Sequence, residues 1–440
     1  MVQTELPESG LVFWPVGTGD STTIVVDENT VVQVDLHDMK SADEDDAVVA
    51  AVIDRLEETL PRPDGETPYL ALFALTHADL DHCGGFADLL DSSILIGEIW
   101  ATPRLWRELS DDTEMCEDAR RFQEEVERRV QATLAAVEKG HEPASGDRVL
   151  IIGYDDDREL HSYSELPDAY FTGPGHTITS IDGVSVSDRF EAFVHAPFHD
   201  DCAGERNDTS LALQIQLRHP DGTVGRALLL GDLAYPTIKK IFDYSEGHNR
   251  ADRLAWDVLL SPHHCSKKVM YATGEDGTEE RKQDILDQLA DHASDDAYIV
   301  ASARPFRDED KTGDNPPHLL AKEAYEEITS NPILCTGEYP TEEAPHPVVF
   351  ALEPGEGLVL QDVEELEEAR LTKSAGQSGG WRTLAALGAT VFAVGAAAAA
   401  ARRRAQQIPQ QGTTDRVGAA VRQARGDEAA PVDAVGFGRQ

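Results

Sequence analysis

Residues 76–85 place four potential metal ligands within six positions. The segment reads Thr-His-Ala-Asp-Leu-Asp-His-Cys-Gly-Gly, and its candidate ligands are His77, Asp79, Asp81 and His82. It directly follows an apolar, strand-like run, Tyr69 to Leu75. A strand that ends in a tight loop can direct these side chains to one point, and imidazole with carboxylate suits zinc, manganese or iron. The alternative interpretation is an acidic, solvated turn before a helix.

Two later segments also place polar residues directly after apolar runs. The run Ala227 to Leu230 ends in a Gly-Asp pair that contains Asp232, and Val258 to Leu260 leads to His263 and His264. Each pattern alone is more typical of a surface turn. Their order after the first cluster favours a shared site, in which one His binds metal and the other acts on the substrate as an acid or oxyanion donor. The sequence does not choose between the two.

The first cluster resembles the H-x-H-x-D-H signature of metallo-β-lactamase-fold hydrolases, which is followed by Gly-Gly. Asp79 stands where that signature has its second His, and the resulting H-x-D-x-D-H-x-G-G pattern is similar to the hydrolase domain of the ComEC competence (DNA-uptake) protein and its free-standing relatives. Further blocks of that branch follow in the same order over roughly residues 10–355. They are Phe13 to Ser21 (F-x-x-V-G-x-G-D-S), Val31 to Asp35, Asn207 to Leu213 (N-x-x-S-L-x-L), Ala227 to Asp232, Leu259 to Ser266 (P-H-H-G-S, with Cys265 for Gly), His318 and Thr336-Gly337.

The resemblance implies an α/β fold, the αββα sandwich, and a site with two divalent metal ions, Zn²⁺ or Mn²⁺. His77 and Asp79 would bind one ion, Asp81 and His82 the other, and Asp232 would bridge them. His263 and His264 complete the expected ligands, and Asp81, His263 and His264 are the expected catalytic residues. Residues expected to orient ligands or contact substrate are Asp20, Asp35, Asn207, Ser210, Ser266 and His318. His199 and Asp200 are spare candidates for a third His that the branch lacks.

Two metal ions about 3.5–4 Å apart lower the pKa of a bridging water and hold the attacking and leaving oxygens of an ester or phosphodiester. Replacing a neutral imidazole by the carboxylate of Asp79 makes its site harder, which favours Mn²⁺ or Mg²⁺ over Zn²⁺ without excluding zinc. The leading hypothesis is a phosphodiesterase or nuclease acting on nucleic acid or a nucleotide. Two alternatives stay open: a hydrolase of small esters, thioesters or lactams, and a non-catalytic metal-binding sensor or partner module.

The chain is strongly acidic. It has 82 acidic and 38 basic residues and a formal charge of −44. Such a surface predicts adaptation to molar salt, where the Debye length is about 3 Å. The composition shows no basic groove for nucleic acid. The five cysteines lie far apart, which favours a reducing compartment. Met1 to Leu11 lacks a basic region followed by an apolar run, so we expect a cytoplasmic protein without a signal peptide.

Residues 1–370 are predicted to form the hydrolase domain. We expect strands within 11–34, a helix at 45–60 and a long helix at 113–139, whose apolar residues Phe122, Val126, Val130, Leu134 and Val137 are three or four apart. The region 104–206 is expected to carry an insertion over the active-site mouth. A helix at 283–293 and a strand at 298–301 follow.

The composition changes sharply near residue 371. Residues 371–440 carry a net charge of +5, against −49 for residues 1–370. Within this Ala/Arg-rich tail, residues 383–401 are uncharged and precede three arginines. Nineteen residues match the length of a membrane span, which would make the protein membrane-associated. Ten of them are Ala, however, and the alternative is an Ala-rich helix in an otherwise disordered end.

Deleting residues 375–440 should leave a folded and active protein, because no candidate ligand lies there. Comparing the activity and the thermal unfolding of the full-length and truncated proteins checks this. Loss of activity on truncation would make the tail part of the catalytic unit, and membrane fractionation of the full-length form alone would support the anchor.

Overall fold

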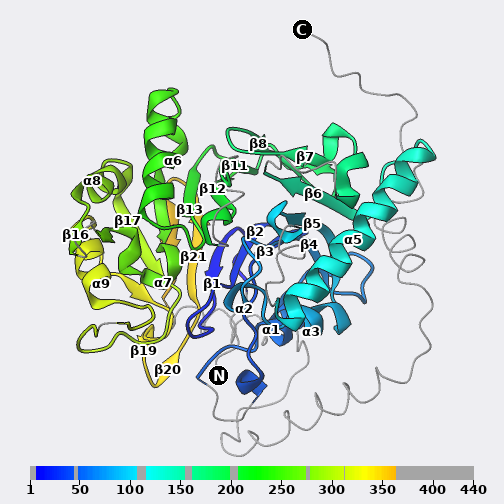
Figure 1. Ribbon diagram of the computed structural model, residues 1–440. Coiled ribbons are helices and arrows are strands. Elements are labelled where there is room, and N and C mark those ends of the chain that lie inside the picture. The colour runs from blue at the N-terminus through cyan, green and yellow to red at the C-terminus, as the bar shows by residue number, and fades with distance from the viewer. Residues whose placement is uncertain are drawn as a thin grey trace, which may run out of the picture.

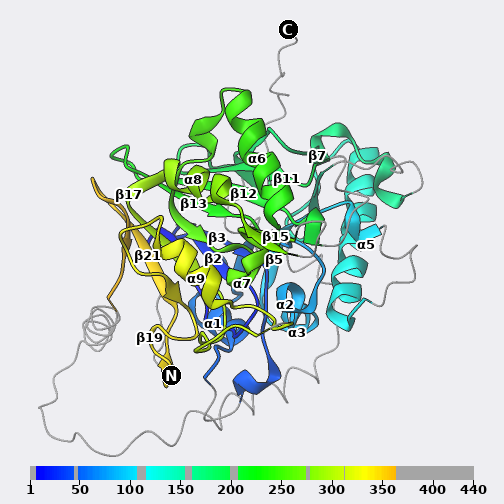
Figure 2. The same cartoon turned by 60° about the vertical axis from the view of Figure 1, so that its left-hand side comes forward.

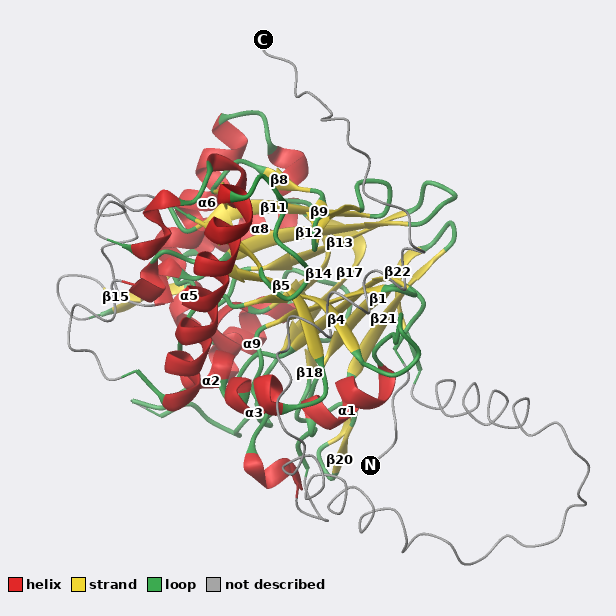
Figure 3. Cartoon of the chain, turned by 90° about the vertical axis from the view of Figure 1, so that its right-hand side faces the viewer, coloured by secondary structure: helices red, strands yellow, loops and turns green. Residues whose placement is uncertain are grey.

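Two β-sheets form the interior, and helices cover the outer face of each (Figure 1). The computed structural model describes residues 6–43, 48–106, 115–153, 161–198, 207–273, 278–311 and 313–362. The four-layer αββα sandwich that the sequence predicts is therefore confirmed. In the view of Figure 3 most helices stand towards the left, and the strands extend from there to the right.

The first sheet has nine strands within the described ranges. From edge to edge they are β22 (Gly357–Leu360), β21 (Val348–Glu353), β1 (Gly10–Phe13), β2 (Thr22–Asp27), β3 (Thr30–Val34), β4 (Tyr69–Ala74), β5 (Leu95–Ala101), β6 (Arg148–Ile152) and β7 (Phe171–Thr172). The strands from β3 to β7 run parallel, and the others pair antiparallel.

The second sheet has seven strands among the described residues. In order they are β18 (Leu334–Cys335), β17 (Ala293–Ala301), β14 (Trp256–Leu260), β13 (Val224–Leu229), β12 (Ala212–Arg218), β11 (Phe190–Ala196) and β8 (Thr177–Ile178). Strands β13, β14, β17 and β18 run parallel. Short hairpins pair β9 (Ser180–Ile181) with β10 (Val184–Ser185), β15 (Tyr271–Thr273) with β16 (Glu279–Arg281), and β19 (Pro340–Thr341) with β20 (Ala344–Pro345).

Helices pack on the two outer faces. The first sheet is covered by α1 (Val52–Thr59), α2 (Leu80–Cys83), α3 (Phe86–Asp91) and α5 (Glu117–Glu138), and the second by α6 (Tyr235–Gly247), α8 (Gln283–Asp291) and α9 (Leu319–Glu326). The turn α7 (Pro262–Cys265) follows β14. The 3₁₀ turns are η1 (Lys40–Asp43), η3 (Ser162–Glu165), η4 (Asp168–Tyr170), η6 (Asn207–Thr209), η7 (Ala251–Arg253) and η8 (Lys267–Val269).

Three apolar layers hold the sandwich together. In β2, Ile24 faces the second sheet while its neighbour Val25 faces the helices, because successive strand residues point to opposite faces. Both faces are covered, so the central strands are apolar almost throughout. Ile215 of β12 and Val258 of β14 share the layer with Ile24.

The predicted elements agree with the structure in type and differ at their ends. The helix predicted at 45–60 begins at Val52, and residues 44–47 lie outside the described ranges. The long helix α5 buries Phe122, Val126 and Val130 against the first sheet, as its spacing indicates. The strand predicted at 298–301 begins earlier, at Ala293.

The region 104–206 contributes to both sheets. Its helix α5 covers the first sheet, β6 and β7 extend that sheet, and β8 and β11 form one edge of the second. The insertion over the active-site mouth stays a prediction. Among the described residues, no helix is long and apolar enough to cross a membrane. The segment 383–401 lies outside them.

A buried polar network outside the main site ties the β9–β10 hairpin to the first sheet. Glu98 of β5 accepts hydrogen bonds from Trp100 Nε1 at 2.9 Å and from the amide of Asp182 at 2.6 Å. The Tyr69 hydroxyl donates to Asp182 at 2.6 Å. Burial raises the pKa of Glu98 to about 7, and the charge of Asp182 adds to this effect. The folded protein therefore holds a proton on Glu98 over a pH range in which the unfolded chain has lost it.

Glu98→Gln should reduce the loss of stability on going from pH 5 to pH 8. The folded-state pKa lies above the unfolded one, so the parent's free energy of unfolding falls as the pH rises through about 7, and a glutamine cannot ionise. Denaturant unfolding at both pH values measures the difference, with Glu138→Gln, an exposed position of α5, as the matched control. Equal losses in Glu98→Gln and the parent would contradict the prediction.

Candidate metal centre

The candidate site lies where strand ends of both sheets meet. Asp35 follows β3 and His77 follows β4, which are parallel neighbours in the first sheet. Asp232 follows β13 and His263 follows β14, parallel neighbours in the second. The carboxyl ends of parallel strands lie at one edge of a sheet, so each sheet brings its polar residues to that edge. A hydrogen bond from the amide of Leu211 to the carbonyl of Thr76, 3.0 Å, joins the two edges.

The carboxylate of Asp232 is divided between two groups of side chains. Its Oδ1 lies 3.1 Å from His82 Nε2 and 3.5 Å from His264 Nε2. Its Oδ2 lies 3.8 Å from His77 Nε2 and 3.7 Å from His263 Nε2. One buried carboxylate thus faces a different pair of imidazoles with each oxygen.

Each group of side chains also includes one further aspartate. Asp79 Oδ2 lies 3.6 Å from His77 Nε2, and Asp81 Oδ2 lies 3.4 Å from His264 Nε2. The side chains of Asp79 and Asp81 are 30% and 38% exposed, unlike that of Asp232, which is 4% exposed. The open side of the site is therefore the side of Asp79 and Asp81.

The side chains around Asp232 thus form two groups, which we call half-sites. The first half-site is His77, Asp79, His263 and Asp232 Oδ2, and the second is Asp81, His82, His264 and Asp232 Oδ1. His77 thus lies beside Asp79, and Asp81 lies beside His264, while the binding of one ion by each group stays a prediction. Both members of the His pair take part, His263 in the first half-site and His264 in the second.

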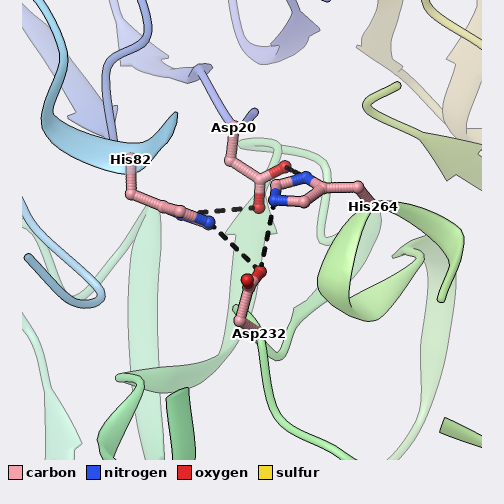
Figure 4. A group of neighbouring side chains, drawn as sticks. All are labelled: Asp20, His82, Asp232 and His264. Atoms are coloured by element: carbon pink, nitrogen blue, oxygen red, sulfur yellow. Dashed lines mark ion pairs between the residues drawn. The ribbon is translucent and has the colours of Figure 1, made fainter. Parts of the chain in front are cut away.

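Asp20 lies closer to the centre than its predicted supporting role requires. Ligand atoms of Asp20, His82, Asp232 and His264 all lie within 4.8 Å of one another, and all four residues are buried. Figure 4 shows His82 and His264 approaching from opposite sides, with Asp20 and Asp232 between them. Asp20 Oδ1 is 3.3 Å from His264 Nδ1. Asp20 therefore either orients His264 or binds the same cation.

The loop before β2 can carry Asp20 to this position only because Gly19 precedes it. Gly19 has φ +150°, and a Cβ there would lie 2.3 Å from His37 Nδ1 and 2.7 Å from the carbonyl oxygen of Asp81. The amide of Asp20 donates to that same carbonyl at 2.9 Å. Any side chain at position 19 would push the loop away from the second half-site.

Asp35 orients His82. Its Oδ2 lies 2.7 Å from His82 Nδ1. Thr76 donates its amide to Oδ1 and its hydroxyl to Oδ2 of Asp35, each at 2.7 Å. Asp35 accepts the Nδ1 proton, which leaves the Nε2 lone pair of His82 pointing to Asp232. The hydrogen bond expected of Asp35 is thus present.

The His pair owes its direction to an unusual backbone. His263, His264 and Cys265 have φ values of 52°, 54° and 63°, so α7 is a left-handed turn and not a regular helix. This region disfavours side chains with a Cβ and favours glycine. The amide of His263 donates to the carbonyl of Gly231 at 3.0 Å, which holds the turn beside Asp232.

Asn207 and Ser210 support the first half-site. Asn207 Nδ2 donates to Asp232 Oδ2 at 3.4 Å. Ser210 Oγ lies 3.3 Å from His77 Nδ1 and accepts from the amide of Asp232, also at 3.3 Å. Both residues thus contact side chains or backbone of the first half-site, and their predicted role in orienting ligands stays a prediction.

Ser266 and His318 contact the backbone that directly follows the His pair. Ser266 caps η8 by accepting from the amide of Lys268 at 3.3 Å. His318 Nδ1 accepts from the amide of Lys267 at 3.3 Å, and its own amide donates to the carbonyl of Cys265. They hold the backbone that follows the left-handed turn. His199 and Asp200 lie outside the described residues.

Two residues of the site region were missed by the sequence interpretation. Thr76, which opens the first motif, holds Asp35 in place. His37 packs against the loop of Gly19, and burial lowers its pKa to about 4. Thr76 could have been found as the polar residue that ends β4. His37 carries no local signal, because its neighbours come from other loops.

The charges of the site demand a cation. Burial alone would lower the pKa of His82, but Asp232 and Asp35 raise it well above its usual value. Burial would raise the pKa of Asp232, but the positive charge on His82 and His264 holds it well below its usual value. The carboxylates thus attract positive charge strongly, and without metal, protons on the imidazoles supply it.

Unsatisfied polar atoms point to the same centre. His77 Nε2, His82 Nε2, His264 Nε2 and Asp232 Oδ1 are buried and have no hydrogen-bond partner. Buried polar atoms without partners are rare, and several that converge on one point indicate an ion. Imidazole nitrogen and carboxylate oxygen match the donor preference of Zn²⁺ and Mn²⁺. The residues therefore fit a metal centre.

Comparison with known proteins adds little to this picture. No protein-family model matches the chain, and no curated protein matches it. Among solved structures, the chain is similar to the metallo-β-lactamase MIM-1 from Novosphingobium pentaromativorans, with 14% sequence identity and a TM-score of 0.27. That match covers 58% of this chain and 74% of the other. The four-layer arrangement is established by the sheets, helices and apolar layers themselves.

Asp35→Asn should weaken metal binding about 10- to 100-fold, because the amide no longer fixes the Nδ1 proton of His82 with a full negative charge. Calorimetric titration of the metal-free protein with Mn²⁺ and Zn²⁺ measures this. Asp88→Asn, an exposed change of the same type in α3, is the control. Unchanged affinity in Asp35→Asn would exclude the orienting role.

Proposed function

We propose that the chain is a metal-dependent hydrolase with two divalent cations, one in each half-site, and that it cleaves a phosphodiester of a nucleic acid or nucleotide. The observation that carries the binuclear proposal is the division of the Asp232 carboxylate, whose two oxygens face separate pairs of imidazoles. The unsatisfied nitrogens of His77, His82 and His264 support it.

The first half-site would hold one ion and the second half-site the other. When bound, such ions supply an activated water and stabilise the negative charge that develops on the substrate oxygens. The protein's own contribution is orientation. Asp35 sets the ring of His82, Ser210 contacts the ring of His77, and the left-handed turn sets His263 and His264.

The substrate approaches from the side of Asp79 and Asp81, the most exposed of the proposed ligands. His263 is 14% exposed, whereas His264 is 2% exposed. His263 therefore lies nearer than His264 to the side from which the substrate approaches. The buried walls formed by His82, Asp20 and His264 exclude bulk water from the other side.

Three basic side chains lie near segments of the site, in a chain with a formal charge of −44. Arg104 lines a small cavity beside His77 together with Leu75, Ala78, Thr102, Leu105 and Phe122. Burial lowers the pKa of His263, and the nearby charge of Lys268 adds to this shift. Arg304 Nε lies 3.9 Å from the Cβ position of Gly17, in the loop that carries Asp20. Cations concentrated around the site in an acidic protein favour an anionic substrate such as a phosphodiester.

Elemental analysis should find two transition-metal ions per chain, because the half-sites offer separate ligand sets. One ion or none in protein that retains all its ligands would remove the binuclear mechanism.

Asp79→Asn should lose metal affinity and hydrolysis together. Asp79→His should keep the metal and shift its preference from Mn²⁺ to Zn²⁺, since imidazole is the softer ligand. Activity of the three forms over titrations of both ions separates these outcomes.

Arg304→Ala should raise the KM for an anionic substrate roughly tenfold, as expected for one lost hydrogen bond to a charged group. The assay uses a chromogenic phosphodiester, single-stranded DNA, a neutral ester and a β-lactam, in molar KCl with Mn²⁺. Arg307→Ala, which removes an exposed arginine paired with Asp314 at 2.9 Å, is the control. Turnover of the ester or lactam alone would redirect the proposal to small-molecule hydrolysis, and no turnover of any substrate would favour a binding module.

A further inference from the structure

Two cysteines from different elements lie side by side beneath the second half-site. Cys83 ends α2, directly after His82, and its side chain is fully buried. Cys116 is the N-cap of α5 and is half-buried. Their sulfurs are 3.7 Å apart, although 33 positions separate them in sequence. Figure 2 shows α2 and α3 beside α5, and the amide of Ala87 donates to Asp118 at 2.9 Å across this contact.

The two thiols differ in reactivity. Cys116 Sγ accepts a hydrogen bond from the amide of Ala119 at 3.4 Å, at a helix N-terminus that favours negative charge. The hydrogen bond with Cys83 lowers the pKa of Cys116 to about 6, against the opposing effect of burial. Cys83 is fully buried behind Cys116. Cys116 is therefore the accessible nucleophile, and Cys83 is a buried thiol within reach of it.

We propose that Cys116 and Cys83 form a peroxide-reactive dithiol, in which Cys116 is oxidised first and Cys83 resolves it as a disulfide. The Cys116 thiolate attacks the terminal oxygen of a hydroperoxide, the O–O bond breaks, and a sulfenic acid forms while hydroxide (or an alkoxide) leaves and takes a proton from solvent. The Cys83 sulfur then attacks the Cys116 sulfur, the S–O bond breaks, and a second water leaves with the Cys83 proton. Two thiols lose two electrons, and one peroxide gains them.

Closing the bond moves a segment that carries two proposed ligands. The sulfurs must approach from 3.7 Å to about 2 Å. Cys83 directly follows Asp81 and His82 on α2, so its shift towards α5 displaces these side chains from Asp232. A misplacement of about 1 Å can reduce catalysis as much as 100-fold. This consequence depends on the proposed hydrolase function, whereas the disulfide itself does not.

The test uses the full-length protein, reduced and then freed of reductant, in molar KCl. Titration with hydrogen peroxide should remove two thiols per chain, and peptide mass mapping should find Cys83 joined to Cys116. In Cys83→Ser the reaction should stop at a sulfenic acid, which dimedone labels at Cys116. Cys116→Ser should abolish the fast reaction. Cys335→Ser, which removes another buried thiol, should leave it intact.

Oxidation should lower hydrolysis at least tenfold, and dithiothreitol should restore it. Cys116→Ser should be active and insensitive to peroxide. A disulfide that joins Cys202, Cys265 or Cys335 instead, or the absence of any dimedone adduct at Cys116 in Cys83→Ser, overturns the proposal. A Cys83–Cys116 disulfide in a protein without hydrolase activity would retain the dithiol and reject the proposed function, so the two failures are distinguishable.

Discussion

The burial of the Asp232 carboxylate at the junction of the two sheets is the constraint on which the rest of the site depends. A buried carboxylate is costly unless positive charge or hydrogen-bond donors surround it. Here the surroundings are imidazoles from two segments, 77–82 and 263–264, and the side-chain amide of Asn207 from a third. Each of these segments follows or precedes a strand whose other residues are locked in an apolar layer. Sheet packing therefore fixes how far apart the ligands stand before any cation binds.

Backbone strain is concentrated in the same place. Left-handed conformations at Asp35, His263, His264 and Cys265 cost of order 1–3 kcal/mol each. They persist because buried strands and backbone hydrogen bonds on either side fix the conformation of these residues. The strands β3 and β14 end in the apolar interior, and the amides of His263 and Asp35 are held by carbonyls of neighbouring segments. This strain sets the ligand directions, since two consecutive residues in a regular helix or strand could not both point to one carboxylate.

The sequence predicted those parts of the site that depend on local sequence pattern, namely polar residues directly after apolar, strand-like runs. The run before His77 and the run before Asp232 are strands of different sheets that end at adjoining edges, and the αββα layers follow from the alternation of such runs with helices. The sequence could not assign His263 and His264 to separate half-sites, because the assignment depends on a left-handed turn that residue types disfavour. It also underestimated Asp20, whose position depends on a contact between the Gly19 loop and α2, distant in sequence.

The mixture of ligand types resolves a conflict that the protein's charge creates. With a formal charge of −44, a cage of carboxylates alone would attract sodium, potassium and magnesium as well as the scarcer transition metals. Imidazole nitrogen discriminates against these harder ions. Each half-site pairs two imidazoles with carboxylate oxygen, so the carboxylates supply affinity and the histidines supply selectivity. Asp79 and Asp81 each add a carboxylate beside two imidazoles, so the two half-sites offer the same types of ligand. They differ in burial, because His82, His264 and Asp20 surround the second half-site with buried side chains.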